Sequence, residues 1–156
     1  MISDLDIAKQ CLTSQGKTLV LAKGGRIIAS SSGRGIADLV RFIEKLGHEL
    51  AGASLADKVV GKAVALMVRY AGIVAVYAGM MSEPAKRALE GTEISYNCEK
   101  LVPMILNRTG DDLCPMERLS LLHEDPNEGF LALKDLAEKM ASKSNYRSTE
   151  VQSKPG

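Results

Sequence analysis

The sequence predicts an α/β fold, in which helices pack on both faces of a mixed β-sheet. Two short apolar runs, Thr18–Ala22 and Ile27–Ala29, flank a Gly-Gly pair, which is the pattern of a β-hairpin. The run Ile73–Ala78 is apolar at every position, as expected of a strand that is covered on both faces. Segments with helical spacing separate the strands. A hairpin that leads into right-handed β–α–β crossovers gives a mixed sheet with helices on both sides.

The elements follow one another in a regular order. Residues 3–14 have near-helical apolar spacing, and a second helix over residues 36–46 is expected to stop near Gly47. Ser54 and Asp57 have the spacing of a capping box, which predicts a helix that begins at Ser54 and runs to about Ala71. Ser82 or Glu83 is expected to cap a short helix with Pro84 in its first turn. The remaining predicted elements are a strand over Glu93–Cys98, a helix over Leu101–Leu106, a helical turn at Cys114-Pro115-Met116-Glu117 and a surface helix over Pro126–Met140.

The length predicts one domain, because 156 residues are enough for one core of ordinary size. We place this domain at residues 1–141. From Ser142 onward the chain has no apolar period, so residues 142–156 are expected to form a disordered tail.

The charge and the cysteines of the chain limit which binding partners and which cellular compartment we expect. Lys and Arg number 20 against 19 acidic residues, so we expect no broad positive field for nucleic acid. The three cysteines are widely spaced and no secretory leader precedes the first helix, which favours the cytoplasm. Val59–Met81 is long enough to cross a bilayer, but it contains Lys62 and Arg69, and we therefore expect no membrane span.

Several short motifs stand out between about residues 3 and 122: GRGI, ADKVVGKA, YAG…VYAG, SEPA, NR and CPME. As a set they resemble a small family of uncharacterised domains with a cytidine-deaminase-like fold. The resemblance implies three α/β/α layers around a mixed sheet of four strands, or five, in the order 2-1-3-4 with strand 1 antiparallel to the rest. The Ser31–Gly35 loop would then lie at the same sheet edge as Asp57 and Ser82.

The same resemblance raises the question of zinc-dependent deamination, and the sequence argues against it. Zinc deaminases need a His or Cys close to a Glu at one helix start and a CxxC pair at the next. Here the matching helix starts read Ala56-Asp57-Lys58 and Ser82-Glu83-Pro84-Ala85. We therefore expect no metal, no cofactor and no deaminase activity, and leave open whether the protein is another kind of enzyme.

The candidate ligand-binding residues gather at the carboxyl edge of the predicted sheet. Lys58 and Lys62 would be neighbours in the first turn of a helix, where their charges repel unless an anion binds between them. The alternative is a capped helix with a solvated basic stripe that continues to Arg69. The full set of predicted ligand contacts is Asp57, Lys58, Lys62, Ser82, Glu83, Arg34, Asn107 and Arg108.

Three classes of function remain. The leading hypothesis is binding of a nucleotide or a similar phosphate-bearing small molecule. The second is an enzyme that uses Cys114, which lies near a predicted helix start where a thiolate is favoured, with Asp57 or Glu83 as acid or base. The third is a structural or assembly role with self-association, which the apolar pair Met80-Met81 would permit.

Overall fold

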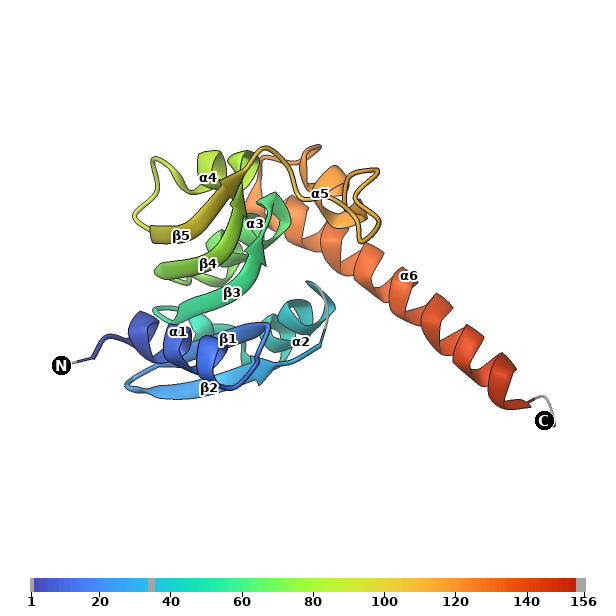
Figure 1. The fold of residues 1–156 in the computed structure, drawn as a ribbon, viewed down its shortest axis with the longest axis horizontal. Helices are drawn as coiled ribbons and strands as arrows, with labels where there is room; N and C mark the ends of the chain where they lie inside the picture. Colours follow the sequence, from blue (N-terminus) through green and yellow to red (C-terminus); the bar gives the residue numbers. More distant parts are fainter. Residues whose placement is uncertain (1, 34–35, 154–156) are drawn as a thin grey trace.

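The structure is a computed structural model that describes residues 2–33 and 36–153 (Figure 1). Arg34 and Gly35 lie outside the described residues. The strands are β1 (Leu19–Lys23), β2 (Arg26–Ser31), β3 (Ser54–Val60), β4 (Ala75–Ser82) and β5 (Ser95–Val102). The helices are α1 (Asp4–Ser14), α2 (Ile36–Leu46), α3 (Lys62–Ala71), α4 (Glu83–Leu89), α5 (Pro115–Ser120) and α6 (Pro126–Ser153), with a 3-10 turn η1 (Gly47–Leu50) after α2.

The five strands form one mixed sheet in the order β2-β1-β3-β4-β5. β1 runs antiparallel to both β2 and β3, whereas β3, β4 and β5 are parallel. The carboxyl ends of β2, β3, β4 and β5 therefore lie at the same edge of the sheet. The predicted hairpin is confirmed, and Gly24 and Gly25 at its tip have φ values of 65° and 82°, which glycine adopts readily.

Helices cover both faces of this sheet, as predicted. α1 lies on one face, where Ala8, Cys11 and Leu12 pack against Val20, Ala56 and Tyr77 (Figure 1). α2, α3 and α4 cover the other face and share the larger core, and α6 packs across α2 and α3. The rings of Tyr70 in α3 and Phe130 in α6 stack with their centroids 4.2 Å apart.

The expected helix over residues 54–71 is wrong in its first half. Residues Ser54–Val60 form the central strand β3, and α3 begins only at Lys62, with Gly61 as its N-cap. Ser54 and Asp57 do not form a capping box: the Asp57 carboxylate instead accepts a hydrogen bond from Val59 N at 3.1 Å. Both faces of β3 are covered at its start, so Ser54, Leu55 and Ala56 are all buried and the alternation typical of a strand is hidden.

The elements after β4 differ from the prediction in two further places. Residues Leu101–Leu106 are not helical: β5 ends at Val102, and Pro103, which lacks an N–H, begins a loop that leads to α5. α6 continues as helix to Ser153, through most of the segment expected to be a disordered tail, because no Gly or Pro interrupts the chain before Pro155. Residues 154–156 of that tail lie outside the described residues.

Candidate functional site

A cavity of about 310 Å³ lies at the carboxyl end of β3. Its walls come from the end of β3, the start of α3, α2 and the residues that follow β5. We call residues 103–120, the loop after β5 together with α5, the cover segment. The lining is largely apolar, and it consists of Thr18, Leu19, Gly33, Ile36, Leu39, Asp57, Lys58, Val59, Gly61, Ala63, Val64, Ile105, Cys114, Met116 and Glu117. The site is therefore at the sheet edge where open α/β folds bind ligands, as the sequence predicts.

Asp57 and Lys58 are the polar residues of β3 in the lining of this cavity, and Asp57 is the less exposed of the two. Burial raises the pKa of Asp57 from 3.8 to about 7, and the hydrogen bonds from Val59 N and Lys58 N oppose this rise only in part. The side chain is half-buried and borders the cavity. Near neutral pH Asp57 therefore exists both as a carboxylate and as a carboxylic acid, and it can accept or donate a hydrogen bond. Strongly perturbed groups in a pocket are typical of functional sites.

Glu117 is the second carboxylate of the cavity lining, and it is almost fully buried. Its Oε1 accepts a hydrogen bond from Lys62 N at 2.7 Å, and its Oε2 accepts one from Ile105 N at 2.8 Å. The Ser82 hydroxyl lies 3.4 Å from Oε1. Glu117 thus connects the cover segment to the first residue of α3 and to the end of β4.

Lys62 does not form the predicted pair with Lys58. Lys62 is the first residue of α3, and its ammonium group is 2.7 Å from Glu124 Oε1. The Lys62 side chain is only 7% exposed, whereas that of Glu124 is 88% exposed. The Lys62 hydrogen bond lowers the pKa of Glu124. Lys58 lies in β3 and is exposed, so the two lysines are not neighbours on one helix.

Of the other predicted ligand contacts, some lie at or next to the cavity and others do not. Ser82 is buried, caps α4 through Ala85 N at 3.2 Å and reaches Glu117, so it lies next to the cavity. Glu83 is half-buried in the first turn of α4 and does not line the cavity. Gly33 lines the cavity, which confirms that the loop after β2 reaches this edge. Arg34 lies outside the described residues.

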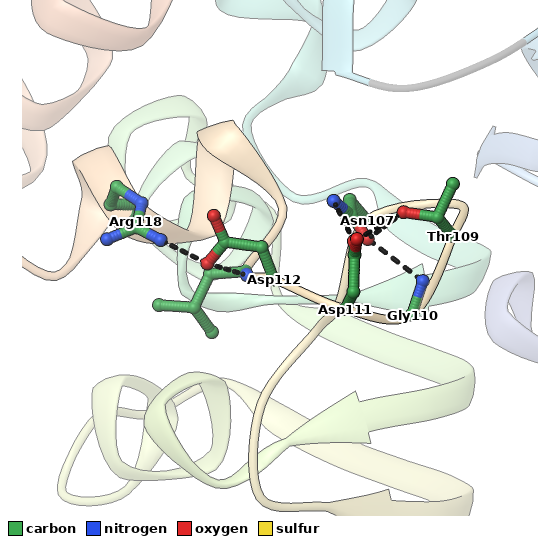
Figure 2. A network of polar contacts seen from close by, with 7 residues as sticks. Asn107, Thr109, Gly110, Asp111, Asp112 and Arg118 are labelled. Carbon is green, nitrogen blue, oxygen red and sulfur yellow. Dashed lines mark hydrogen bonds and ion pairs between the residues drawn. The ribbon is translucent and has the colours of Figure 1, made fainter.

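Asn107 makes polar contacts within its own loop (Figure 2). It is not among the residues that line the cavity. Its Oδ1 accepts hydrogen bonds from Gly110 N at 2.9 Å and Thr109 Oγ1 at 3.1 Å. Its amide nitrogen donates to Asp111 at 3.1 Å, and the Thr109 and Asn107 hydrogen bonds lower the pKa of Asp111. Arg108 is exposed and is not part of the cavity wall. Asn107 and Arg108 are therefore turn residues in this structure, and neither lies at the cavity as a ligand contact would.

Cys114 is the N-cap residue of α5, as expected, and it lines the cavity together with Asp57. Met81, in contrast, is buried in the main core, and β4 is an internal strand, so the pair Met80-Met81 does not form an apolar sheet edge. Among the described residues, no group of three or more His, Cys, Asp and Glu side chains is placed to hold a metal ion.

Sequence reasoning missed Glu117 and Gly61 as site residues. A Cβ on Gly61 would lie 3.0 Å from Glu117 Oε1 and 3.1 Å from Ile105 Cγ1, so the cover segment approaches bare backbone at this point. Gly61 between Val60 and Lys62 is a local signal for a strand end and a helix start. The role of Glu117 has no local signal, because it acts on a residue 55 positions away.

Comparison with known proteins assigns the chain to a family. The model of the family TM1506, described as a domain of unknown function (DUF1893), matches residues 7–137. This protein therefore belongs to that family, and the resemblance to a family of uncharacterised domains is confirmed.

Among solved structures, the chain is similar to a DUF1893 family protein (TM1506) from Thermotoga maritima. The two are 26% identical, with a TM-score of 0.75, over 85% of this chain and 90% of that one. No curated protein matches the chain. No helix in the described part of the chain is both long and apolar enough to cross a membrane. These comparisons give no activity.

Proposed function

We propose that this protein binds a small molecule of the nucleoside or nucleotide class in the cavity at the end of β3. The observation that carries this proposal is a titratable carboxyl, Asp57, in the wall of a largely apolar cavity of about 310 Å³. Ligand sites commonly combine apolar walls with a few polar groups that fix orientation, and the volume is in the range of such sites. A planar base would contact the apolar walls and present its N–H groups to Asp57.

The same proposal includes a cytidine-deaminase-like fold that lacks the zinc site. The order β2-β1-β3-β4-β5 with β1 antiparallel supports it, since the missed strand β3 fits between the predicted strands 1 and 3. The two helix starts at the carboxyl edge read Gly61-Lys62-Ala63 and Ser82-Glu83-Pro84. Neither contains the His, Glu or Cys residues in the pattern that zinc-dependent deamination needs. We therefore propose binding without zinc chemistry, in the cytoplasm, and the protein would act as a sensor or a regulatory partner.

A panel of nucleobases, nucleosides and nucleotides tests the binding proposal by thermal unfolding and calorimetry. A ligand that binds only the folded state raises the melting temperature as its concentration rises. Asp57→Asn is expected to weaken binding at least tenfold, because the amide presents an N–H in place of one carboxylate acceptor. Asp135→Asn, an exposed change on α6, is the matched control and is expected to bind normally. If no member of the panel changes the melting temperature of the unmodified protein, the proposal is wrong.

The second candidate is an enzyme that uses Cys114 as its nucleophile. The observation that favours it is that Cys114 and Asp57 line the same cavity, where Asp57 could accept the thiol proton. Iodoacetamide is then expected to modify Cys114 faster than Cys98 at pH 7, and Asp57→Asn is expected to slow that reaction. Buried Cys11 serves as an internal control. Equal rates at Cys114 and Cys98 would contradict this candidate.

The third class is a structural or assembly role, which the sequence permits because the apolar pair Met80-Met81 could lie exposed at a strand edge. Met81 is instead buried in the core, so this pair no longer favours that role. Native mass spectrometry of the purified protein separates it from the other two. A homo-oligomer without a bound small molecule would favour assembly, whereas a co-purified ligand of nucleoside mass would favour binding.

A further inference from the structure

β5 forms one edge of the sheet, and among the described residues only β4 pairs with it. Figure 1 shows β5 and β2 at the two ends of the sheet. The pairing of β5 with β4 runs without a bulge from Ser95 to Val102, whereas the pairing of β1 with β2 is interrupted between Leu21 and Ala22. Exposed edge strands normally carry a bulge, a proline or charges that prevent pairing with another chain. β5 has no bulge, and its first proline comes after its end, at Pro103.

The backbone groups on the free side of β5 belong to its even-numbered residues. Ser95 N donates to Val74 O at 3.1 Å, so the N–H and C=O groups of Ser95 point toward β4. Because these groups alternate in direction along a strand, those of Tyr96, Cys98 and Lys100 point to the free side. Among the described residues, none of these three forms a backbone hydrogen bond outside the sheet. The free side therefore presents a row of donors and acceptors with which a further strand can pair.

The two charged side chains of β5 leave this side open. Glu99 lies on the face that α1 covers, where the Tyr77 hydroxyl donates to Glu99 Oε1 at 3.1 Å and Lys9 Nζ lies 3.6 Å from the same oxygen. Tyr77 is in β4, so the Glu99 carboxylate leans away from the free side. Lys100 lies on the opposite face of the sheet and is exposed. A partner strand therefore has to accommodate one ammonium group, which an aromatic ring opposite it would do.

We propose that β5 is a self-association surface, on which a second copy of this chain pairs its own β5 in antiparallel orientation about a two-fold axis at Cys98. In this register Cys98 is opposite the partner's Cys98, and Lys100 is opposite the partner's Tyr96. Glu99 is opposite the partner's Asn97. The ammonium group then contacts an aromatic ring, the carboxylate contacts an amide, and no like charges are opposite each other. The two-fold axis makes each of these contacts occur twice.

The charges of β5 favour this register over its neighbours. The two-fold axis has to lie at a residue, because opposite residues of an antiparallel pair point their side chains to the same face. An axis at Glu99 would place two carboxylates opposite each other, and an axis at Lys100 would do the same with two ammonium groups; like charges in these positions are destabilising. An axis at Asn97 avoids the repulsion but pairs β5 only as far as Glu99, whereas an axis at Cys98 pairs it as far as Leu101. The axis at Cys98 therefore gives the longest pairing without like charges opposite each other.

Sedimentation equilibrium of the full chain in reducing buffer measures dimerisation, and it needs no ligand. The unmodified protein is expected to form a dimer that dissociates on dilution. Cys98→Pro is expected to weaken dimerisation about tenfold or more, because it removes the hydrogen bond that the Cys98 N–H of each protomer donates across the axis. β4 does not use that N–H, so the proline variant keeps the sheet of the protomer. Cys98→Ser keeps the N–H, and this matched control is expected to dimerise like the unmodified protein.

A disulfide scan tests the register without a proline. Opposite residues of a hydrogen-bonded antiparallel pair have Cα atoms about 5.5 Å apart, which a disulfide can span. In a chain with Cys11→Ser and Cys114→Ser, the oxidant diamide is expected to link two copies through Cys98. When Cys98→Ser and Asn97→Cys are added to these changes, linking is expected to be about tenfold slower or more, because residues that are not directly opposite are too far apart for a disulfide.

Three results would overturn the inference. A protein that stays monomeric at every concentration would leave β5 free for a strand of a different protein and would refute self-association. A dimer that a folded Cys98→Pro variant leaves unchanged would have its interface elsewhere. Equal rates of disulfide formation at positions 97 and 98 would refute the register, and this result decides the question if Cys98→Pro does not fold.

Discussion

Replacing Asp57 by Asn is expected to stabilise the folded protein above pH 7 and to remove part of its pH dependence. The pKa of Asp57 is raised from 3.8 to about 7 in the folded state. Between these values the folded protein holds a proton that the unfolded chain releases, so the free energy of unfolding falls as pH rises through this window. Ionisation of Asp57 in the folded state therefore carries a free-energy cost that the unfolded chain does not have. Below about pH 4 Asp57 is protonated in both states and this cost is absent; above pH 7 it is present in full. The amide that Asp57→Asn introduces cannot ionise, so this variant does not have this free-energy cost.

The structure sets a ceiling on the size of this effect. One pKa unit corresponds to about 1.4 kcal/mol, so a rise of about three units gives at most about 4 kcal/mol. Asp57 is only half-buried, and its partial exposure to solvent screens part of its charge. We therefore expect about 1–2 kcal/mol at pH 8, which is a rise of roughly 2–8 °C in melting temperature for a domain of this size. The hydrogen bond from Val59 N is retained, because the new amide oxygen can accept it.

Urea unfolding at a series of pH values from 4 to 8 measures this difference. The unmodified protein, Asp57→Asn and the control Asp135→Asn are compared, and the contributions of all other titrating groups cancel in the differences. The stability gain from Asp57→Asn should be near zero at pH 4 and largest at pH 8. Parallel curves for the unmodified protein and Asp57→Asn would refute the claim that the cavity raises the pKa of this carboxyl.

Three further outcomes are expected. Gly61→Ala should cost about 1–3 kcal/mol by urea unfolding, because the added Cβ contacts Glu117 Oε1 and Ile105 at 3.0–3.1 Å; an unchanged midpoint would contradict this packing. Glu124→Gln should lower the melting temperature more than the double change Lys62→Met with Glu124→Gln, because the single change leaves a buried ammonium without its partner; equal melting temperatures would show that the ion pair is irrelevant. A chain that ends at Ala141 should melt within about 2 °C of the full chain, since Ala137 is the last core residue among the α6 side chains that the structure describes, and a larger loss would mean that residues 142–156 support the domain.

The parts of the fold that the sequence predicts correctly are those with strong local signals. The hairpin follows from two adjacent glycines, and Ser82 caps α4, which has Pro84 in its first turn, as expected. β3 was missed because a strand covered on both faces does not alternate, and because Ser54 and Asp57 have by chance the spacing of a helix cap. Its register is fixed by neighbours far away in sequence, with Leu55 opposite Leu21 in β1 and Val76 in β4.

The predicted ligand contacts were placed at the sheet edge where the cavity lies, but the predicted set lacks two residues that line it, Gly61 and Glu117. Asp57 lies at the predicted edge of the sheet, in the lining of the cavity. The predicted local structure is wrong, because Asp57 belongs to the strand β3 and not to the start of a helix. The basic pair was wrong because Gly61 ends β3 before Lys62 begins α3. Glu117 could not be predicted, since its hydrogen bonds to Lys62 and Ile105 depend on how two distant segments dock.

The packing of α6 across α2 and α3 has a consequence for how the chain acquires its structure during synthesis. Phe130, Leu133 and Ala137 complete a core whose other members are all made earlier, and α3 is exposed on that side until they emerge from the ribosome. A nascent chain that ends before Phe130 would present the apolar flank of α3 to other proteins, which is the kind of surface that chaperones bind. Productive folding of this domain is therefore expected to begin only after Ala137 has left the ribosome.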